Sequence, residues 1–285
     1  MDNLSNIGTI KAVMEKHGFT FSKALGQNFL VNPSVCPRIA ELGNAKEGFG
    51  VLEIGTGIGV LTNELAKRAD KVVAVEIDQR LIPVLEETLA EYDNVKIIND
   101  DIMNVDLKKL IETEFSGLDV AVCANLPYYI TTPIVMNLLE NRYPIESITI
   151  MVQKEVAERM RAVPGTKDYG ALSLAVQYYA DTYIAANVPP NCFIPRPNVG
   201  SAVIRLTVLK EPQTEVSNEK QMFEIIRASF NQRRKTLANA IANYAGLSFS
   251  RSDVENALTK MDLPVTVRGE SLNLQQFAAL SNILT

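Results

Sequence analysis

The chain has 285 residues, of which 47% are hydrophobic, so it is long enough to bury one large core beside a smaller one. A formal net charge of -5 gives no overall positive field, which leaves only local basic patches to bind nucleic acid. No apolar run approaches the roughly 18 residues that span a bilayer, the first residues lack the form of a signal peptide, and the three cysteines are far apart. We therefore expect a cytoplasmic protein with no membrane segment, no metal and, with a single histidine, no Ser-His-Asp triad.

The N-terminal residues predict an amphipathic helix and then an ordered segment. Apolar side chains at helical spacing within residues 7–14 share one face, and residues 21–33 follow with amide side chains among aromatic ones. One interpretation of this segment is a lid over a ligand, with Gln27 and Asn28 as hydrogen-bonding groups. The alternative is a packed N-terminal arm.

Residues 51–62, Val-Leu-Glu-Ile-Gly-Thr-Gly-Ile-Gly-Val-Leu-Thr, predict a buried strand, a tight glycine turn and a helix. Such a turn directs the helix N-terminus and several backbone N–H groups at a ligand. The spacing of Gly55, Gly57 and Gly59 differs from the dinucleotide fingerprint Gly-x-Gly-x-x-Gly, and Glu53 would repel a pyrophosphate. An acidic residue suits S-adenosylmethionine (SAM), which has an ammonium group and no phosphate. The alternative is a turn that only connects the strand to the helix.

Two further strands are expected to end in acidic residues. Residues 71–76 predict a strand that ends in Glu76, about twenty residues beyond the glycine turn, where open α/β sites place the acid that binds ribose hydroxyls. Residues 94–102 predict a third strand that ends near Asp100 and Asp101. An acid at this position can accept a hydrogen bond from an adenine amino group, although a pair of solvated turn acids is the alternative.

A fourth strand over residues 118–124 is followed directly by Asn125, Leu126, Pro127 and Tyr128. An adenine amino group is a poor nucleophile because its lone pair is delocalised into the ring. The side-chain oxygen of Asn125 and the backbone carbonyl of Leu126, held rigid by Pro127, can accept its hydrogens and localise that lone pair. Tyr128 offers a face for base stacking, worth roughly 1–3 kcal/mol. The alternative is a β-turn with a surface tyrosine.

A cysteine nucleophile is the rival chemistry at this position. Cys123 lies inside the apolar fourth strand, where a free cysteine usually behaves as a small inert hydrophobe. We therefore favour amine methylation over attack by a thiolate on a pyrimidine carbon.

The next part of the chain completes the sheet. Strands are predicted over residues 145–152, 181–188 and 201–209. Helices are predicted between the first and second of these strands, and a stiff proline-rich loop over residues 189–200 joins the second to the third. Phe193 in that loop could cover the second face of a bound base, or it could belong to the core. The alternation of strands and helices predicts a doubly wound, mainly parallel α/β sheet with its ligand at the carboxyl ends of the strands.

The C-terminal part predicts a second domain. Residues 210–218 have the composition of a linker and the pattern beyond them is wholly helical, with Ser252 and Glu255 as an expected capping box. We therefore predict a methyltransferase domain with its N-terminal lid over residues 1–209 and a smaller all-α domain over residues 210–285. A basic cluster in the helical part could contact RNA phosphates or could be a solvated helix face; it comprises Arg227, Arg233, Arg234 and Lys235.

In combination, these motifs resemble the small-subunit (16S) ribosomal RNA adenine N6-dimethyltransferase family. The matching stretches are residues 25–30, Leu-Gly-Gln-Asn-Phe-Leu; residues 53–59 of the glycine turn; Val75 and Glu76; Asp100 and Asp101; Asn125 to Tyr128; and residues 193–201, Phe-Ile-Pro-Arg-Pro-Asn-Val-Gly-Ser. They span nearly the whole predicted methyltransferase domain, with no departure at a motif position.

The resemblance implies a Rossmann-like class I SAM methyltransferase that adds two methyl groups to N6 of each of two adjacent adenines in a loop near the 3′ end of 16S rRNA. It also implies a role in small-subunit biogenesis and in kasugamycin sensitivity, and we expect a monomer. The residues that it implies for SAM binding are Asn28, Leu30, Gly55, Glu76, Asp101 and Asn125. Asn125 to Tyr128 and Phe193 would hold the target base, and the motifs add Gln27, Glu53 and Gly57 to the cofactor site.

Three other functions are alternatives to this one. The glycine spacing and Glu53 speak against an oxidoreductase with a nucleotide cofactor. A large-subunit rRNA adenine N6-methyltransferase would share the site, and only the length and the proline-rich loop favour the small-subunit enzyme. A non-catalytic rRNA-binding assembly factor is disfavoured by the intact Asn-Leu-Pro-Tyr motif.

Overall fold

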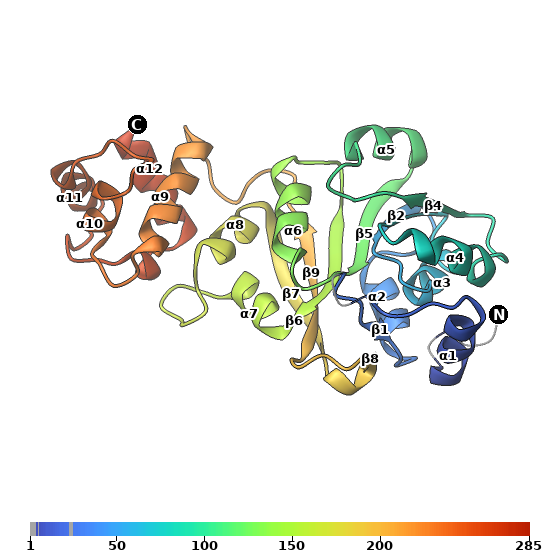
Figure 1. Ribbon diagram of the computed structural model, residues 1–285. Coiled ribbons are helices and arrows are strands. Elements are labelled where there is room, and N and C mark those ends of the chain that lie inside the picture. Colours follow the sequence, from blue (N-terminus) through green and yellow to red (C-terminus); the bar gives the residue numbers. More distant parts are fainter. Residues whose placement is uncertain (1–3, 5, 23–24) are drawn as a thin grey trace. The chain divides into compact units, whose positions relative to one another are not determined.

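A seven-stranded sheet forms the centre of the first of two compact units into which the chain divides (Figure 1). The computed structural model describes residue 4, residues 6–22 and residues 25–285, and every count of elements refers to these residues. The first unit comprises Met1–Ala157 and Tyr183–Val208. In sheet order, the strands are β4 (Val95–Asn99), β3 (Lys71–Glu76), β2 (Phe49–Ile54), β5 (Asp119–Asn125), β6 (Ser147–Gln153), β9 (Ser201–Val208) and β7 (Ala180–Val188).

The direction of the strands follows from their connections. Strands β4, β3, β2, β5 and β6 are parallel neighbours, as expected where helical crossovers join them, and β9 pairs antiparallel with β6. Every residue of β2 is buried, as is typical of a parallel strand at the centre of a sheet covered on both faces. The prediction of a doubly wound, mainly parallel α/β sheet is confirmed. It places the carboxyl ends of β2, β3, β4 and β5 at one edge of the sheet.

The helices of the first unit include those predicted within residues 7–14 and after the glycine turn, and one over residues 107–114 that was not predicted. They are α1 (Ile7–Lys16), α2 (Val35–Leu42), α3 (Val60–Ala66), α4 (Ile82–Thr88), α5 (Leu107–Glu114) and α6 (Thr131–Glu140). Helix α2 packs against α3 and β6, and α3 packs against β3. Buried apolar side chains of α1, α2, α3 and α4 form one core with residues of β2, β3, β5 and β6.

The segment before α2 is a packed arm. Its short strand β1 (Phe29–Leu30) pairs antiparallel with β8 (Phe193–Ile194), which lies in the proline-rich loop together with a short 3₁₀ turn, η2 (Pro190–Cys192). The rings of Phe19, Phe21 and Phe29 pack on one another. Of the predicted lid over residues 21–33, residues 23 and 24 lie outside the described residues.

The second unit comprises Glu158–Thr182 and Leu209–Thr285. Its helices are α8 (Ala171–Tyr179), α9 (Glu219–Asn231), α10 (Leu237–Ala242), α11 (Arg251–Lys260) and α12 (Leu274–Leu284), and α7 (Lys154–Arg161) crosses the boundary between the units. The domain boundary at residue 209 stays a prediction. The division into compact units is not the same as the predicted domains, because residues 158–182 group with the C-terminal helices.

Aromatic packing explains why residues 158–182 group with these helices. The ring of Phe223 on α9 packs against both Tyr178 and Tyr179, and both tyrosine hydroxyls donate to the carboxylate of Glu219. The Tyr169 hydroxyl donates to the backbone carbonyl of Leu272. Nothing in the local sequence pattern of residues 158–182 indicates these distant partners.

The predicted capping box of Ser252 with Glu255 is wrong: α11 begins at Arg251, so the box is formed by Ser250 and Asp253, two residues earlier. Over the ranges that the structure describes, no helix combines the length and apolar character needed to cross a membrane.

Candidate active site

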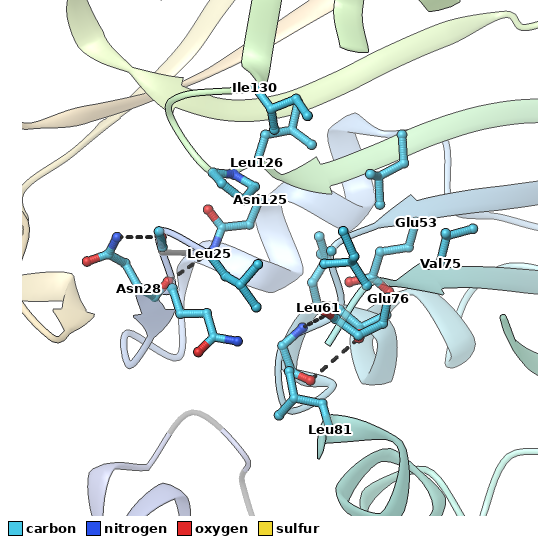
Figure 2. A pocket seen from close by; sticks show the side chains of 18 of the residues that line it. Leu25, Asn28, Glu53, Leu61, Val75, Glu76, Leu81, Asn125, Leu126 and Ile130 are labelled. Atoms are coloured by element: carbon cyan, nitrogen blue, oxygen red, sulfur yellow. Dashed lines mark hydrogen bonds between the residues drawn. The ribbon is translucent and has the colours of Figure 1, made fainter. Parts of the chain in front are cut away.

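A pocket in the first unit lies at the carboxyl ends of β2, β3 and β5 (Figure 2). The ends of parallel strands meet at one edge of a sheet, so motifs far apart in the sequence converge there. Twelve of the predicted site residues line it: Gln27, Asn28, Leu30, Glu53, Gly55, Gly57, Glu76, Asp101, Asn125, Leu126, Pro127 and Tyr128. Their individual roles remain predictions.

The glycine turn forms the floor between β2 and α3. Gly55, Gly57 and Gly59 have φ angles of 76°, 57° and 88°, a left-handed conformation that other residues rarely adopt. A Cβ atom at Gly57 would lie 3.2 Å from the ring of Phe29, so the arm packs closely on this turn. The turn therefore requires glycine for two reasons, its backbone conformation and the approach of the arm.

Glu76 fastens the glycine turn to the end of β3. Its Oε2 accepts hydrogen bonds from Thr56 Oγ1 at 3.0 Å and from Gly57 N at 3.1 Å, and its Oε1 accepts one from Asp78 N at 2.9 Å. Burial raises the pKa of Glu76, and the backbone donors of Asp78 and Gly57 oppose that rise. Since a carboxylate has about four lone-pair sites, it retains capacity to accept a further hydrogen bond from a ligand.

Glu53 is a fully buried acid that lines the pocket. Among the described residues, neither of its carboxylate oxygens has a hydrogen-bond partner. Burial raises the pKa of Glu53 to about 8, and the negative charge of Glu76 adds to this rise. The nearby Thr62 hydroxyl lowers the pKa in part, although it does not form a hydrogen bond of normal geometry with the carboxyl group. An uncompensated buried carboxyl group is costly, and a cationic ligand group would compensate it.

The arm closes one side of the pocket and is fastened by side chains. Gln27 Nε2 donates to Asp78 Oδ2 at 2.8 Å, and Gln27 Oε1 accepts from the backbone N–H of Ser22 at 2.7 Å. Asp78 also forms an ion pair with Arg80 at 2.6 Å, which holds the pKa of its carboxyl group below its ordinary value. Gln27 thus has a structural use in the arm, and its expected contact with the cofactor stays a prediction.

Asp100 and Asp101 follow β4 and both line the pocket. Asp100 is exposed and Asp101 is half-buried. Asp101 Oδ1 accepts a hydrogen bond from Met103 N at 2.9 Å, which fixes the orientation of the carboxylate. Asp101 is therefore the better placed of the two to present its second oxygen to a ligand.

Asn125 stands at the carboxyl end of β5, next to the arm (Figure 2). Its Nδ2 donates to the backbone carbonyl of Asn28 at 3.4 Å, and the Asn28 side chain donates to the carbonyl of Gly26 at 2.9 Å. Within the described part of the chain, no donor reaches Asn125 Oδ1 or the carbonyl oxygen of Leu126. These two oxygens are the acceptors that the sequence predicts for an adenine amino group.

Pro127 and Tyr128 are fixed by bonds to neighbouring elements. The Pro127 carbonyl accepts hydrogen bonds from Ile130 N and Thr131 Oγ1, both at 3.2 Å, at the start of α6. The Tyr128 hydroxyl lies 2.8 Å from Ser201 Oγ at the start of β9. The turn that carries the two free acceptors is therefore rigid on both sides.

Phe193 is placed differently from the other predicted site residues. Its side chain is buried in the core, with 4% exposure, and it pairs with Leu30 between β8 and β1. It does not line this pocket, which agrees with the alternative of a core residue. Its expected contact with the base stays a prediction and would require the ring to become exposed.

Three residues that shape the site were missed by the sequence analysis as site residues. Thr56 lies between two of the glycines and donates a hydrogen bond to Glu76, Asp78 accepts one from Gln27, and Ser201, the last residue of a quoted motif, lies within hydrogen-bond distance of Tyr128. The motif membership of Ser201 is a signal that could have indicated it. No local signal indicates that Asp78 holds the arm.

Comparison with known proteins identifies the family. Residues 18–283 match the family model described as ribosomal RNA adenine dimethylase. A protein of Lachnoclostridium phytofermentans named ribosomal RNA small subunit methyltransferase A is 54% identical over 273 residues, covering 95% of this chain and 94% of that protein.

Two solved structures are also similar. A dimethyladenosine transferase from Plasmodium falciparum is 26% identical with a TM-score of 0.73, covering 88% of this chain and 95% of that one. The 23S rRNA methyltransferase ErmE is 28% identical with a TM-score of 0.68, covering 90% and 99%. On the match to the family model and the identity to its relatives, the chain belongs to the ribosomal RNA adenine dimethylase family.

Proposed function

We propose that this protein transfers methyl groups from SAM to N6 of two adjacent adenines in a loop near the 3′ end of small-subunit ribosomal RNA, giving dimethyladenosines. The observation that carries this proposal is the convergence of the Asn125–Tyr128 turn with two buried acids, Glu53 and Glu76, in one pocket. Membership of the adenine dimethylase family supports the same reaction. We further propose that it acts as a cytoplasmic monomer.

The pocket fits SAM on the chemistry of its own residues. The unpartnered carboxyl group of Glu53 is matched by the ammonium group of the cofactor, and Glu76 retains acceptor sites for the ribose hydroxyls. Asp101 would accept a hydrogen bond from the adenine amino group of SAM itself, while the arm residues Asn28 and Leu30 would cover the cofactor. When bound, SAM supplies an electrophilic methyl group.

The adenine would be activated by position rather than by a strong base. Asn125 Oδ1 and the Leu126 carbonyl oxygen accept the two hydrogens of the amino group, so that its lone pair is no longer delocalised into the ring. Tyr128, fixed by Ser201, provides the surface on which the extruded base stacks. Alignment of this kind accelerates a displacement without a histidine at the site, because the methylated amine loses its proton readily to water.

Contact with the RNA backbone is assigned to the second unit. Arg227 pairs with Glu224 at 2.6 Å and Arg233 pairs with Glu270 at 3.4 Å, so these two arginines are partly neutralised. Arg234 and Lys235 are exposed and, among the described residues, have no ion-pair partner. Unpaired surface cations of this kind suit phosphate contacts.

The methylation of purified particles tests the proposal. Small subunits that lack these methyl groups, large subunits and naked rRNA are each incubated with labelled SAM. We expect label in N6,N6-dimethyladenosine of the small subunit. The similarity to ErmE makes a large-subunit target the second candidate, and label in large-subunit rRNA alone would establish it instead. Binding of small subunits without transfer of label would indicate a non-catalytic assembly factor.

A further inference from the structure

Tyr129 is an exposed aromatic residue on the rim of the pocket, directly after the turn that holds the two acceptors. Its exposure of 61% is the highest among the large hydrophobic residues that the structure describes. Its neighbour Tyr128 is tied to Ser201, whereas no described residue forms a hydrogen bond with the Tyr129 hydroxyl. Its place in the lining distinguishes Tyr129 from other exposed residues, because an aromatic ring at the mouth of a pocket is positioned to contact a bound ligand.

The ring is supported from one side by the arm. Gly26 has a left-handed φ of 61°, and a Cβ atom there would lie 3.5 Å from both Cδ1 and Cε1 of Tyr129 and 3.4 Å from Cβ of Pro127. The hydrogen bond from Asn28 Nδ2 to the Gly26 carbonyl, at 2.9 Å, stabilises this part of the arm. The ring therefore rests on a fixed backbone while most of its surface stays open to solvent.

We propose that Tyr129 is the stacking platform for the nucleotide next to the adenine in the pocket, an inference that rests on the proposed function. Extruding one base into the pocket removes a stacking partner from its neighbour in the loop. An aromatic ring on the rim replaces that partner and is tolerant of the identity of the base. Because the two target adenines are adjacent, the base on Tyr129 is the other adenine when one of them is methylated, and the nucleotide that flanks the pair when the other is methylated.

Substitutions at Tyr129 separate the ring from the hydroxyl group. Tyr129→Phe keeps the ring, Tyr129→Leu keeps a large apolar side chain without a π face, and Tyr129→Ala removes both. On small subunits that lack the methyl groups, we expect Tyr129→Phe to keep the wild-type kcat/KM, and Tyr129→Leu and Tyr129→Ala to lose about 5- to 150-fold, the range for one stacked base. The loss should lie mainly in KM for the subunit. Tyr183→Ala is the matched control, since Tyr183 on β7 is 57% exposed and does not line the pocket.

A ring that acted only by supporting the arm would give a different result. In that case the affinity for S-adenosylhomocysteine, measured without RNA, would fall in Tyr129→Ala and Tyr129→Leu in proportion to the loss of kcat/KM. We expect that affinity to stay within twofold of the wild-type value. A parallel fall, or a wild-type kcat/KM in Tyr129→Ala, would overturn the stacking role.

Fluorescence gives a direct readout of stacking, because the chain contains no tryptophan. Tyr129→Trp introduces a single indole on the rim, and Tyr183→Trp introduces one as a control. We expect small subunits to quench the indole fluorescence of Tyr129→Trp and to leave that of Tyr183→Trp unchanged; equal signals from the two would contradict the proposal.

The failure of this inference can be told apart from a failure of the proposed function. If Asn125→Ala is inactive while Tyr129→Ala matches the wild type, methylation stands and the platform does not. If the wild type methylates no small-subunit adenine, the proposed function fails, and the quenching experiment still decides whether Tyr129 meets an RNA base.

Discussion

The buried acid Glu53 makes a quantitative prediction about cofactor binding. Its pKa of about 8 in the free protein means that roughly 0.9 of the molecules carry it protonated at pH 7. If an ammonium group of the ligand pairs with it, binding favours the ionised carboxylate, and the proton is released. S-adenosylhomocysteine, which keeps the ammonium group and cannot react, should therefore release up to about 0.9 proton per molecule bound at pH 7.

Calorimetric titration measures this release directly. The enthalpy of binding is recorded in buffers of different ionisation enthalpy, and the slope gives the number of protons. The wild-type affinity should rise up to about tenfold per pH unit between pH 6 and 8, and level off where the ligand amine itself begins to lose its proton. Glu53→Gln should bind more weakly and release almost no proton. Glu64→Gln is the matched control, because Glu64 is paired with Lys67 and Arg68.

The same burial predicts how stability depends on pH in the absence of the ligand. A carboxyl group whose pKa is raised from 4.5 to about 8 contributes stability that is fully present below pH 4.5 and is lost as the pH rises through 8. The difference corresponds to about 5 kcal/mol, as an upper limit. Denaturant unfolding should show this loss in the wild type and not in Glu53→Gln.

The calorimetric titration decides the assignment of Glu53. Equal proton release on ligand binding by the wild type and by Glu53→Gln would refute the pairing of Glu53 with the ammonium group.

The remaining predictions concern the adenine, the RNA backbone and the arm. Asn125→Ala should abolish methyl transfer while small-subunit binding, measured by filter retention, survives; undiminished turnover would disprove the role of its side-chain oxygen. Arg234→Glu combined with Lys235→Glu should weaken small-subunit binding and lessen its salt dependence, and an unaltered slope of log affinity against log salt would make these residues a solvated face. Gln27→Ala removes the bonds to Ser22 and Asp78, so hydrogen exchange in residues 25–30 should speed up and affinity for S-adenosylhomocysteine should fall about tenfold. Unchanged exchange would show that the arm is held without Gln27.

Much of the pocket could be predicted because its residues belong to short motifs at strand ends. The left-handed glycines, Glu76 and Asn125 each follow an apolar run in a pattern of alternating strands and helices. A parallel sheet brings such strand ends to one edge irrespective of the details of packing. Local spacing together with one rule of topology was therefore sufficient to assemble the pocket from separate stretches.

The contacts that hold these motifs in place could not be predicted in the same way. Gln27 and Asp78 are 51 residues apart, and Tyr128 and Ser201 are 73 apart. Polar side chains such as these have many possible partners in an unfolded chain, and only the packing of the core selects one of them. The same reasoning applies to Glu219, whose tyrosine partners place residues 158–182 with the C-terminal helices.

Phe193 illustrates the limit of motif membership as a guide to side-chain direction. The pairing of Leu30 with Phe193 is a backbone register, and in an antiparallel pair it brings opposite side chains to the same face. Leu30 and Phe193 are both buried in the same core cluster, and of the two only Leu30 also lines the pocket. A rotation of β8 that turned Phe193 toward the pocket would break its pairing with β1, which is continuous with the arm. Any contact of Phe193 with a bound base is thus coupled to the arm. Gln27→Ala, which loosens the arm, should therefore alter the order of the arm and the contact of Phe193 with the base together.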